Sequence, residues 1–140
     1  MKILTVLCSA IAACVLLAGC KTAAPSPPLA TEFFAGVWVV EDIDGRGIID
    51  SSRATLLFAP DGTLSGRATC NHMTAIWRAG DGRVMVEPPA LTRMVCAPAL
   101  MNQEHRFLQS LVQVRRYAID ETGALVLTGE DGHSILARQE

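Results

Sequence analysis

The sequence predicts an α+β, mainly β fold: about eight short antiparallel strands forming a curled sheet or partial barrel, with one helix packed on or across it. Three observations lead to this prediction. Short runs rich in apolar and β-branched residues recur along residues 33–140, and turn-forming pairs such as Asp-Gly separate them. One helical pattern follows the fifth run. The length of 140 residues leaves room for a single domain.

The first strands are predicted from composition and turn chemistry. Residues 33–43 are rich in aromatic and β-branched side chains, and the Gly-rich stretch 44–47 ends this strand. Residues 54–58 predict the second strand, which Pro60-Asp61-Gly62 closes as a hairpin signal. From Thr63 the side chains alternate, so the strand that follows has one inward face. That inward face contains Leu64, Gly66, Ala68 and Cys70.

The next hairpin is predicted by two runs, residues 73–78 and 83–87, that flank Gly80-Asp81-Gly82. Pro88 and Pro89 then end the sheet, because a central strand cannot lose those N–H donors.

A helix and three strands complete the domain. Pro98 suits the first turn of a helix that runs to about residue 112. The three strands are expected at residues 115–119, 124–128 and 134–137, with His133 beside the last turn in solvent.

One face of the predicted helix is apolar, at about 100° per residue. It contains Leu100, Met101, Phe107, Leu108, Leu111 and Val112. Glu104 falls inside this apolar arc, where a carboxylate is costly unless it is paired or accepts hydrogen bonds. Two explanations remain open: a structural carboxylate bonded to an Arg or to backbone N–H groups, or a carboxylate inside a ligand cleft.

The N-terminal residues predict export of the protein to the bacterial envelope. Lys2 and the apolar run at residues 3–17 are typical of a signal peptide, and the run is shorter than the roughly 20 residues of a spanning helix. The signal peptide at residues 1–19 ends in Leu17-Ala18-Gly19-Cys20, which resembles the bacterial lipobox. That resemblance implies cleavage before Cys20 and acylation of Cys20, with palmitate, so that the lipid anchors the protein to a membrane.

The lipidated cysteine begins a Pro-rich tether at residues 20–32, which favours extended conformations. Lys21 follows Cys20, and by analogy with enteric sorting this favours the outer membrane, with the domain at residues 33–140 in the periplasm. Without Lys2 the chain has 11 basic and 14 acidic side chains and no basic stripe, so nucleic acid is not an expected partner.

Two cysteines, Cys70 and Cys96, remain after Cys8 and Cys14 leave with the signal peptide and Cys20 is acylated. An even pair in an oxidising compartment predicts a disulfide. Closing this loop of about 27 residues would contribute about 3.5 kcal/mol in the chain-entropy model. Two reduced, buried cysteines acting as small hydrophobes are the alternative.

A zinc site and a thiol enzyme are less favoured. Cys70, His72, Cys96 and His105 have the right ligand types, but their spacing matches no common zinc pattern. A Cys/His/Glu nucleophilic enzyme needs an exposed thiol of lowered pKa. We therefore predict no metal, no cofactor and no catalytic residue, and an enzyme is the least favoured class.

A series of short motifs follows one order along residues 33–138. They are Gly36-x-Trp38, Leu57-Phe58-x-x-Asp61-Gly62, Gly66-x-x-x-Cys70-Asn71, Thr92-x-x-x-Cys96, Met101-x-x-Glu104-x-x-Phe107-Leu108 and a closing hairpin. This ordered set resembles the META domain family, and within it the HslJ-like bacterial lipoproteins. The resemblance implies a small β-barrel-like sheet with one helix, links to heat shock, the envelope stress response, antibiotic tolerance and motility or secretion, and no established catalytic residue.

Two positions depart from the family pattern. Family members usually have Gly where this chain has Thr69, and an aromatic residue where it has Met73. If that glycine supplies a positive φ, Thr69 is strained there, since β-branched residues tolerate that region poorly. Otherwise the backbone is extended at this point, or the loop has shifted.

The predicted function is a non-catalytic binding or assembly role in envelope homeostasis or stress tolerance, with an envelope protein as partner. The binding surface is expected on an open sheet face or in the groove beside the helix. The signature residues there are Asn71, Thr92, Glu104 and Trp38. Two alternatives are an inhibitor of a periplasmic or host hydrolase, and secretin-pilot-like binding of a peptide or acyl chain in an apolar cavity inside the sheet.

Overall fold

The computed structural model describes residues 33–140. The predicted signal peptide at residues 1–19 and the tether at residues 20–32, with Cys20, lie outside the described residues. Within residues 33–140, no helix is long and apolar enough to cross a membrane.

The described part of the chain contains ten strands and the helix α2. In chain order they are β1 (Val37–Ile43), β2 (Arg46–Gly47), β3 (Ala54–Phe58), β4 (Thr63–Ala68), β5 (His72–Gly80), β6 (Arg83–Val86), β7 (Ala90–Leu91), α2 (Pro98–Gln113), β8 (Val114–Ile119), β9 (Leu125–Gly129) and β10 (Ser134–Gln139).

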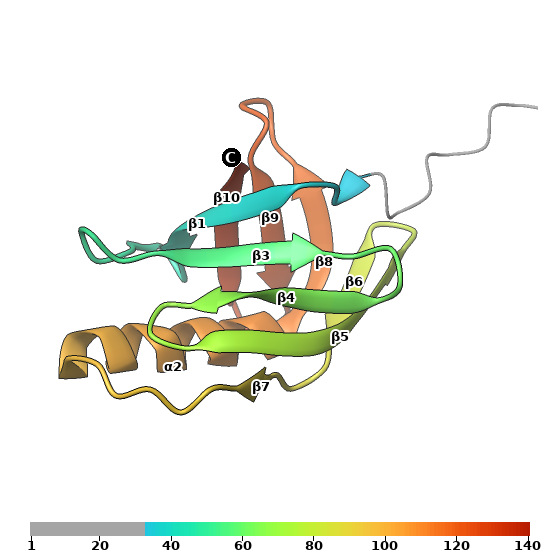
Figure 1. Cartoon of the computed structure of the whole chain (residues 1–140). Helices are drawn as coiled ribbons and strands as arrows, with labels where there is room; N and C mark the ends of the chain where they lie inside the picture. Colours follow the sequence, from blue (N-terminus) through green and yellow to red (C-terminus); the bar gives the residue numbers. More distant parts are fainter. Residues whose placement is uncertain (1–32) are drawn as a thin grey trace, which may run out of the picture.

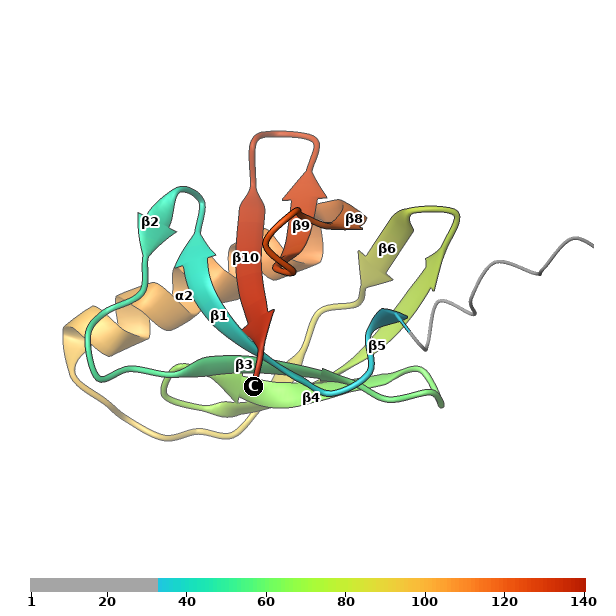
Figure 2. The ribbon, with the colours of Figure 1, turned by 90° about the horizontal axis from the view of Figure 1, so that it is seen from above.

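Eight of these strands close into an antiparallel barrel, in the order β10-β9-β8-β6-β5-β4-β3-β1. Closure is made by β1 and β10, with Val40 opposite Ala137 and Ile43 opposite Ile135. Figure 1 shows β3, β4 and β5 in front of β8, β9 and β10, with α2 along one open end, and Figure 2 shows β1 beside β10. Because the ladder returns on itself, it leaves no long open edge.

The barrel interior is filled by side chains. Phe34, Phe58 and Trp77 are each less than 5% exposed, and their ring centroids lie 4.6–5.0 Å apart. Phe107 and Leu111 of α2, both fully buried, belong to the same core. Burying a large apolar side chain stabilises the fold by about 1.5–3 kcal/mol, so this shared core is what holds the helix on the barrel.

The structure confirms the predicted fold class and adds two short strands. The two-residue strand β2 pairs with the end of β1, within the stretch that was predicted as a break. Pro88 and Pro89 do not end the sheet, because β7 follows them and pairs Thr74 with Ala90. The prolines lie between the strands, where no ladder N–H is needed, and β7 pairs with the start of β5, beyond the residues of β5 that pair with β6.

The buried face of α2 is more polar than predicted. It contains Gln103, Glu104, Phe107, Ser110 and Leu111. Leu100, Met101, Leu108 and Val112 are half-buried instead. The face is turned toward Gln103 and Ser110 because loops of the barrel supply hydrogen-bond partners for both.

Candidate functional site

The Glu104 carboxylate is buried and holds the turn between β4 and β5. Glu104 is only 3% exposed. Oε2 accepts the backbone N–H groups of Cys70 at 2.9 Å and of Asn71 at 2.6 Å, and Oε1 accepts the Asn71 side-chain amide at 2.7 Å. Such charge-assisted bonds offset the cost of burying a carboxylate. The structural explanation for Glu104, with backbone N–H donors, is therefore correct.

Asn71 extends this network to the segment before the helix. Its Oδ1 accepts the Thr92 hydroxyl at 2.8 Å and the Met94 backbone N–H at 2.7 Å. Thr92 Oγ1 in turn accepts the His72 backbone N–H at 3.1 Å. We call residues 92–97 the strap, and Glu104 with Asn71 and Thr92 the Glu104 centre. The centre fixes the strap to β5 and to α2 together.

A disulfide joins Cys70 to Cys96, with the two Cα atoms 6.0 Å apart. It attaches the far end of the strap beside the Glu104 centre, immediately before α2 begins at Pro98. Both sulfurs are used, so neither is available as a zinc ligand or as a nucleophile. Among residues 33–140, no group of three or more His, Cys, Asp or Glu side chains is arranged to hold a metal ion.

Thr69 adopts the positive φ that the glycine of related sequences suggested. Its φ is 119°, a conformation that β-branched residues rarely adopt. The threonine supplies a contact that glycine lacks, since its Oγ1 accepts the Gln103 side-chain amide at 3.1 Å. Gln103 also accepts the Ile49 backbone N–H at 2.7 Å and donates to Ser52 Oγ at 2.9 Å. One buried glutamine thus joins α2 to two loops.

A second polar cluster, which we call the Asp44 cluster, lies further along α2. Asp44 accepts the Ser110 hydroxyl at 2.7 Å and the Ser134 backbone N–H at 2.9 Å. His133 Nδ1 lies 3.2 Å from the same carboxylate, and its side chain is 33% exposed, so the prediction of a solvent position for His133 was wrong. The reason is the β1–β10 pairing, which brings the two turns together.

The charge of Asp44 reflects these contacts. Burial alone raises the pKa of Asp44, but the hydrogen bonds from Ser110, Ser134 and His133, together with the charge of His133, outweigh it. The pKa of Asp44 therefore lies below its usual value of 3.8.

Although the Asp44 cluster has the residue types of a Ser-His-Asp triad, its geometry differs. Both the Ser110 hydroxyl and the Asp44 carboxylate lie nearest Nδ1 of His133. A triad needs the serine on one ring nitrogen and the acid on the other. Ser110 is also completely buried, so no substrate reaches its hydroxyl.

The structure brings together some of the predicted signature residues. Asn71, Thr92 and Glu104 meet beside the disulfide, whereas Trp38 lies in the core and donates its ring N–H to the Phe34 carbonyl at 3.1 Å. Sequence reasoning missed Gln103 and the Asp44 cluster. The available signal was the spacing of Gln103 and Ser110, two polar residues seven apart that flank Phe107 on one helix face.

Comparison with known proteins places this geometry in context. The model of the META domain family matches residues 31–140. Among solved structures, an NMR structure of a protein from Burkholderia xenovorans is similar with a TM-score of 0.65 and 22% identity, covering 86% of this chain and 94% of that one. A second protein solved by NMR is similar with a TM-score of 0.61 and 19% identity, and the match covers 77% of this chain and 92% of that one.

A crystal structure of a DUF4847 family protein from Bacteroides vulgatus gives a TM-score of 0.51 and 16% identity, covering 75% of this chain and 92% of that one. At these identities the likenesses establish the fold alone. No curated protein matches the sequence significantly.

Proposed function

The chain belongs to the META domain family, and we propose that it is a non-catalytic binding module of the bacterial envelope. In this proposal a lipid at Cys20 anchors it to the outer membrane, and the domain binds an envelope protein from the periplasmic side. A role in envelope homeostasis or stress tolerance, as in HslJ-like lipoproteins, belongs to the same proposal.

The observation that carries the proposal is the rigid presentation of the strap. Val95 is 94% exposed and Met94 is 47% exposed. The strap is held on both sides of them: Thr92 N–H donates to the His72 carbonyl at 3.0 Å, and Cys96 is covalently joined to Cys70. A backbone segment that is already held at both ends loses little conformational freedom when a partner covers its side chains.

Binding is favoured over catalysis because the reactive groups are occupied. The Glu104 carboxylate is buried and accepts three N–H donors, both cysteines of the domain are bonded, and the Ser110 hydroxyl is buried. The family match and the structural neighbours give no sign of catalysis.

An inhibitor of a periplasmic or host hydrolase is the second candidate function. The strap favours it, because a short segment fixed by a disulfide, with an exposed side chain at Val95, suits insertion into another protein's cleft. The pilot-like version, with an acyl chain inside the sheet, is not favoured. Phe34, Phe58 and Trp77 occupy that interior.

The experiment places a photoreactive phenylalanine analogue at Val95 in the full chain in living cells. The control carries the same group at Met85, an exposed apolar residue of β6 that is 54% accessible. We expect one discrete cross-linked envelope protein from position 95, and no such product from position 85. Competition by unmodified protein should remove the product, and a Val95→Asp competitor should not.

The outcome separates the candidates. A hydrolase in the product, inhibited stoichiometrically by the purified protein, favours the inhibitor. A structural envelope protein favours assembly. Equal products from positions 85 and 95 would show that the strap has no special role. The anchor is tested in parallel by Cys20→Ser, which should abolish incorporation of labelled palmitate into the protein.

A further inference from the structure

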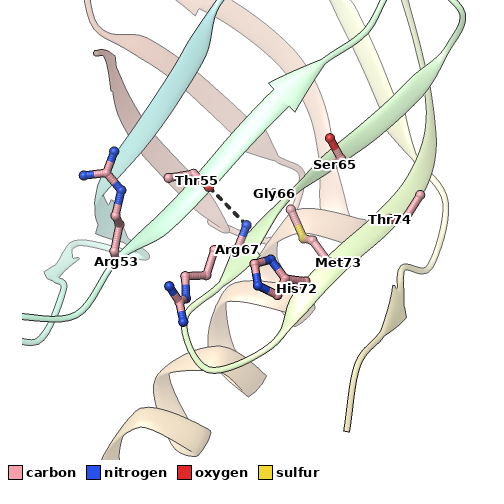
Figure 3. Close-up of a pocket in the computed structure, with 8 residues that line it drawn as sticks. All are labelled: Arg53, Thr55, Ser65, Gly66, Arg67, His72, Met73 and Thr74. Carbon is pink, nitrogen blue, oxygen red and sulfur yellow. Dashed lines mark hydrogen bonds between the residues drawn. The ribbon is translucent and has the colours of Figure 1, made fainter. Parts of the chain in front are cut away.

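Two hollows on the outside of the barrel share the same two arginines. The larger, about 470 Å³, lies over β3, β4 and β5 (Figure 3), and the smaller, about 240 Å³, lies toward the strap and the disulfide. Arg53 and Arg67 line both hollows. Because they share these two residues, the hollows are adjacent, and we treat them as one groove. We call it the arginine groove.

The arginine groove is cationic on a chain that has more acidic than basic residues. No Asp or Glu lines either hollow, and His72 lines the larger one. Arg53 pairs with Glu140 at 2.6 Å, but both side chains are about half exposed, at 49% and 58%, and such pairs are weak. Arg67 forms no salt bridge with any residue of the described range.

Hydroxyl groups line the larger hollow beside the arginines. Thr55, Arg67 and His72 face one another across β3, β4 and β5 (Figure 3), and Ser65 and Thr74 form the next row. Thr55 Oγ1 accepts the Arg67 backbone N–H at 3.0 Å, which leaves its own proton to donate outward. On the other side Ser51, Ser52 and Thr69 line the smaller hollow, where the Ser52 and Thr69 hydroxyls already bond to Gln103.

Gly66, which lines the larger hollow, lies against the backbone of β3. A Cβ at this position would overlap the Thr55 carbonyl oxygen, so any side chain there would force β3 and β4 apart. Close packing of β3 against β4 therefore explains why the signature motif has a glycine at position 66.

We propose that the arginine groove binds an acidic saccharide, with the phosphate or carboxylate of the sugar held by the Arg67 guanidinium and with Arg53 as the second cation of the groove. Guanidinium groups match oxyanions with paired N–H donors. The hydroxyls of Thr55, Ser65 and Thr74 in the larger hollow suit a ligand that is itself rich in hydroxyl groups. Phe, Tyr and Trp are absent from both linings, which argues against a ligand held by base stacking. This inference does not depend on the strap as a protein-binding surface.

The test is an NMR titration of the purified, isotope-labelled protein with glucose 6-phosphate, glucuronate and glucose. We expect saturable shifts of the amide signals of Thr55, Ser65, Arg67 and Thr74 with at least one acidic sugar. Comparing the two acids tells phosphate from carboxylate. Equal binding of neutral glucose, or no saturation with either acid, would overturn the proposal.

Matched variants localise the effect. Arg67→Gln should weaken binding at least about tenfold, because it removes the unpaired guanidinium. Arg46→Gln makes the same charge change on exposed β2, outside the groove, and should leave affinity unchanged. Thr74→Val removes one groove hydroxyl with little change of shape and should weaken binding severalfold. If Arg67→Gln and Arg46→Gln bind alike while the Thr74→Val affinity equals that of the parent, the assignment is wrong.

Discussion

Two polar clusters join α2 to the barrel, and they differ in their access to water. In the Glu104 centre, Glu104 and Asn71 are each 3% exposed. In the Asp44 cluster, the side chains of Asp44 and His133 are 22% and 33% exposed. The first cluster has its carboxylate on the helix and its donors on the barrel, whereas the second has its carboxylate on the barrel and a hydroxyl on the helix.

This difference in exposure predicts that the Glu104 carboxylate has a purely structural role, whereas the Asp44 carboxylate responds to pH. A sealed carboxylate with three N–H donors has no route to exchange its partners for water, so its removal leaves buried donors unsatisfied. A half-open carboxylate beside a histidine can exchange protons with solvent, and its removal can be repaired by water. The two clusters should therefore respond differently to mutation, to reductant and to pH.

The largest effect is expected from Glu104→Ala. It leaves the backbone N–H groups of Cys70 and Asn71 buried without an acceptor, and we expect a loss of about 3–5 kcal/mol in the free energy of unfolding. Urea denaturation at neutral pH measures it. Glu104→Gln keeps one acceptor oxygen and should lose less. A loss below about 1 kcal/mol for the alanine variant would show that water reaches this centre.

Removal of the disulfide comes next. The double variant Cys70→Ala with Cys96→Ala should lose about 2–4 kcal/mol in the free energy of unfolding, since the cross-link restrains the unfolded chain. Urea denaturation with and without reductant measures it, and reductant should then have no further effect on the variant. Intact mass after alkylation under denaturing conditions is the control. The parent protein should take up no alkyl group on Cys70 or Cys96.

Asp44→Asn should cost about 1–2 kcal/mol at neutral pH, less than Glu104→Ala, because water replaces part of the lost bonding. The pKa of Asp44 is lowered in the folded state, so the unfolded chain binds the proton more readily as pH falls. Its stabilisation is full above the unfolded pKa of about 3.9 and is lost as pH falls through the folded pKa. The difference between parent and variant should therefore shrink from about pH 5 downward.

Denaturation of both proteins across this acid range measures the effect. Glu104→Gln, measured in parallel, separates loss of the Asp44 contacts from general acid unfolding. A difference between parent and Asp44→Asn that grows toward low pH would contradict the assignment of the lowered pKa.

The smallest effect is expected at Thr69, at the edge of the Glu104 centre. Thr69→Gly relieves a positive φ of 119° but removes the hydrogen bond from Gln103, so its net change should stay within about 1 kcal/mol. Thr69→Ala removes the same bond and keeps most of the strain. Thermal unfolding should rank glycine above alanine by about 1 kcal/mol. The reverse order would mean that the loop relaxes away from this conformation.

Local signals in the sequence predicted much of this fold. The bounds of β3 follow from a short apolar run between turns, and the start of α2 follows from Pro98. The position of Glu104 on the buried face followed from helical periodicity, and the pairing of Cys70 with Cys96 from compartment and number. The signals for β3, α2 and Glu104 lie within a few residues of the features they predict. The signal for the disulfide is the number of cysteines in the whole chain and its predicted compartment.

The rest depends on barrel closure, which leaves no local trace. Asp44 and His133 are 89 residues apart in the sequence and meet because β1 pairs with β10. The buried role of Gln103 depends on loops around Ile49 and Ser52, some 50 residues earlier. No periodic pattern in the helix records which loops will cover it. The arginine groove likewise arises from three strands and two loops.

The same pairing of β1 with β10 sets an order of events in folding. Val40 faces Ala137, so the first strand of the barrel waits for the last one before its outer ladder is complete. Contacts so distant in sequence form slowly, whereas the hairpins of β3, β4 and β5 and the nearby Cys70–Cys96 bond join close neighbours. During that interval β1 presents an unpaired edge, which is the moment at which the chain is most exposed to aggregation and to chaperones.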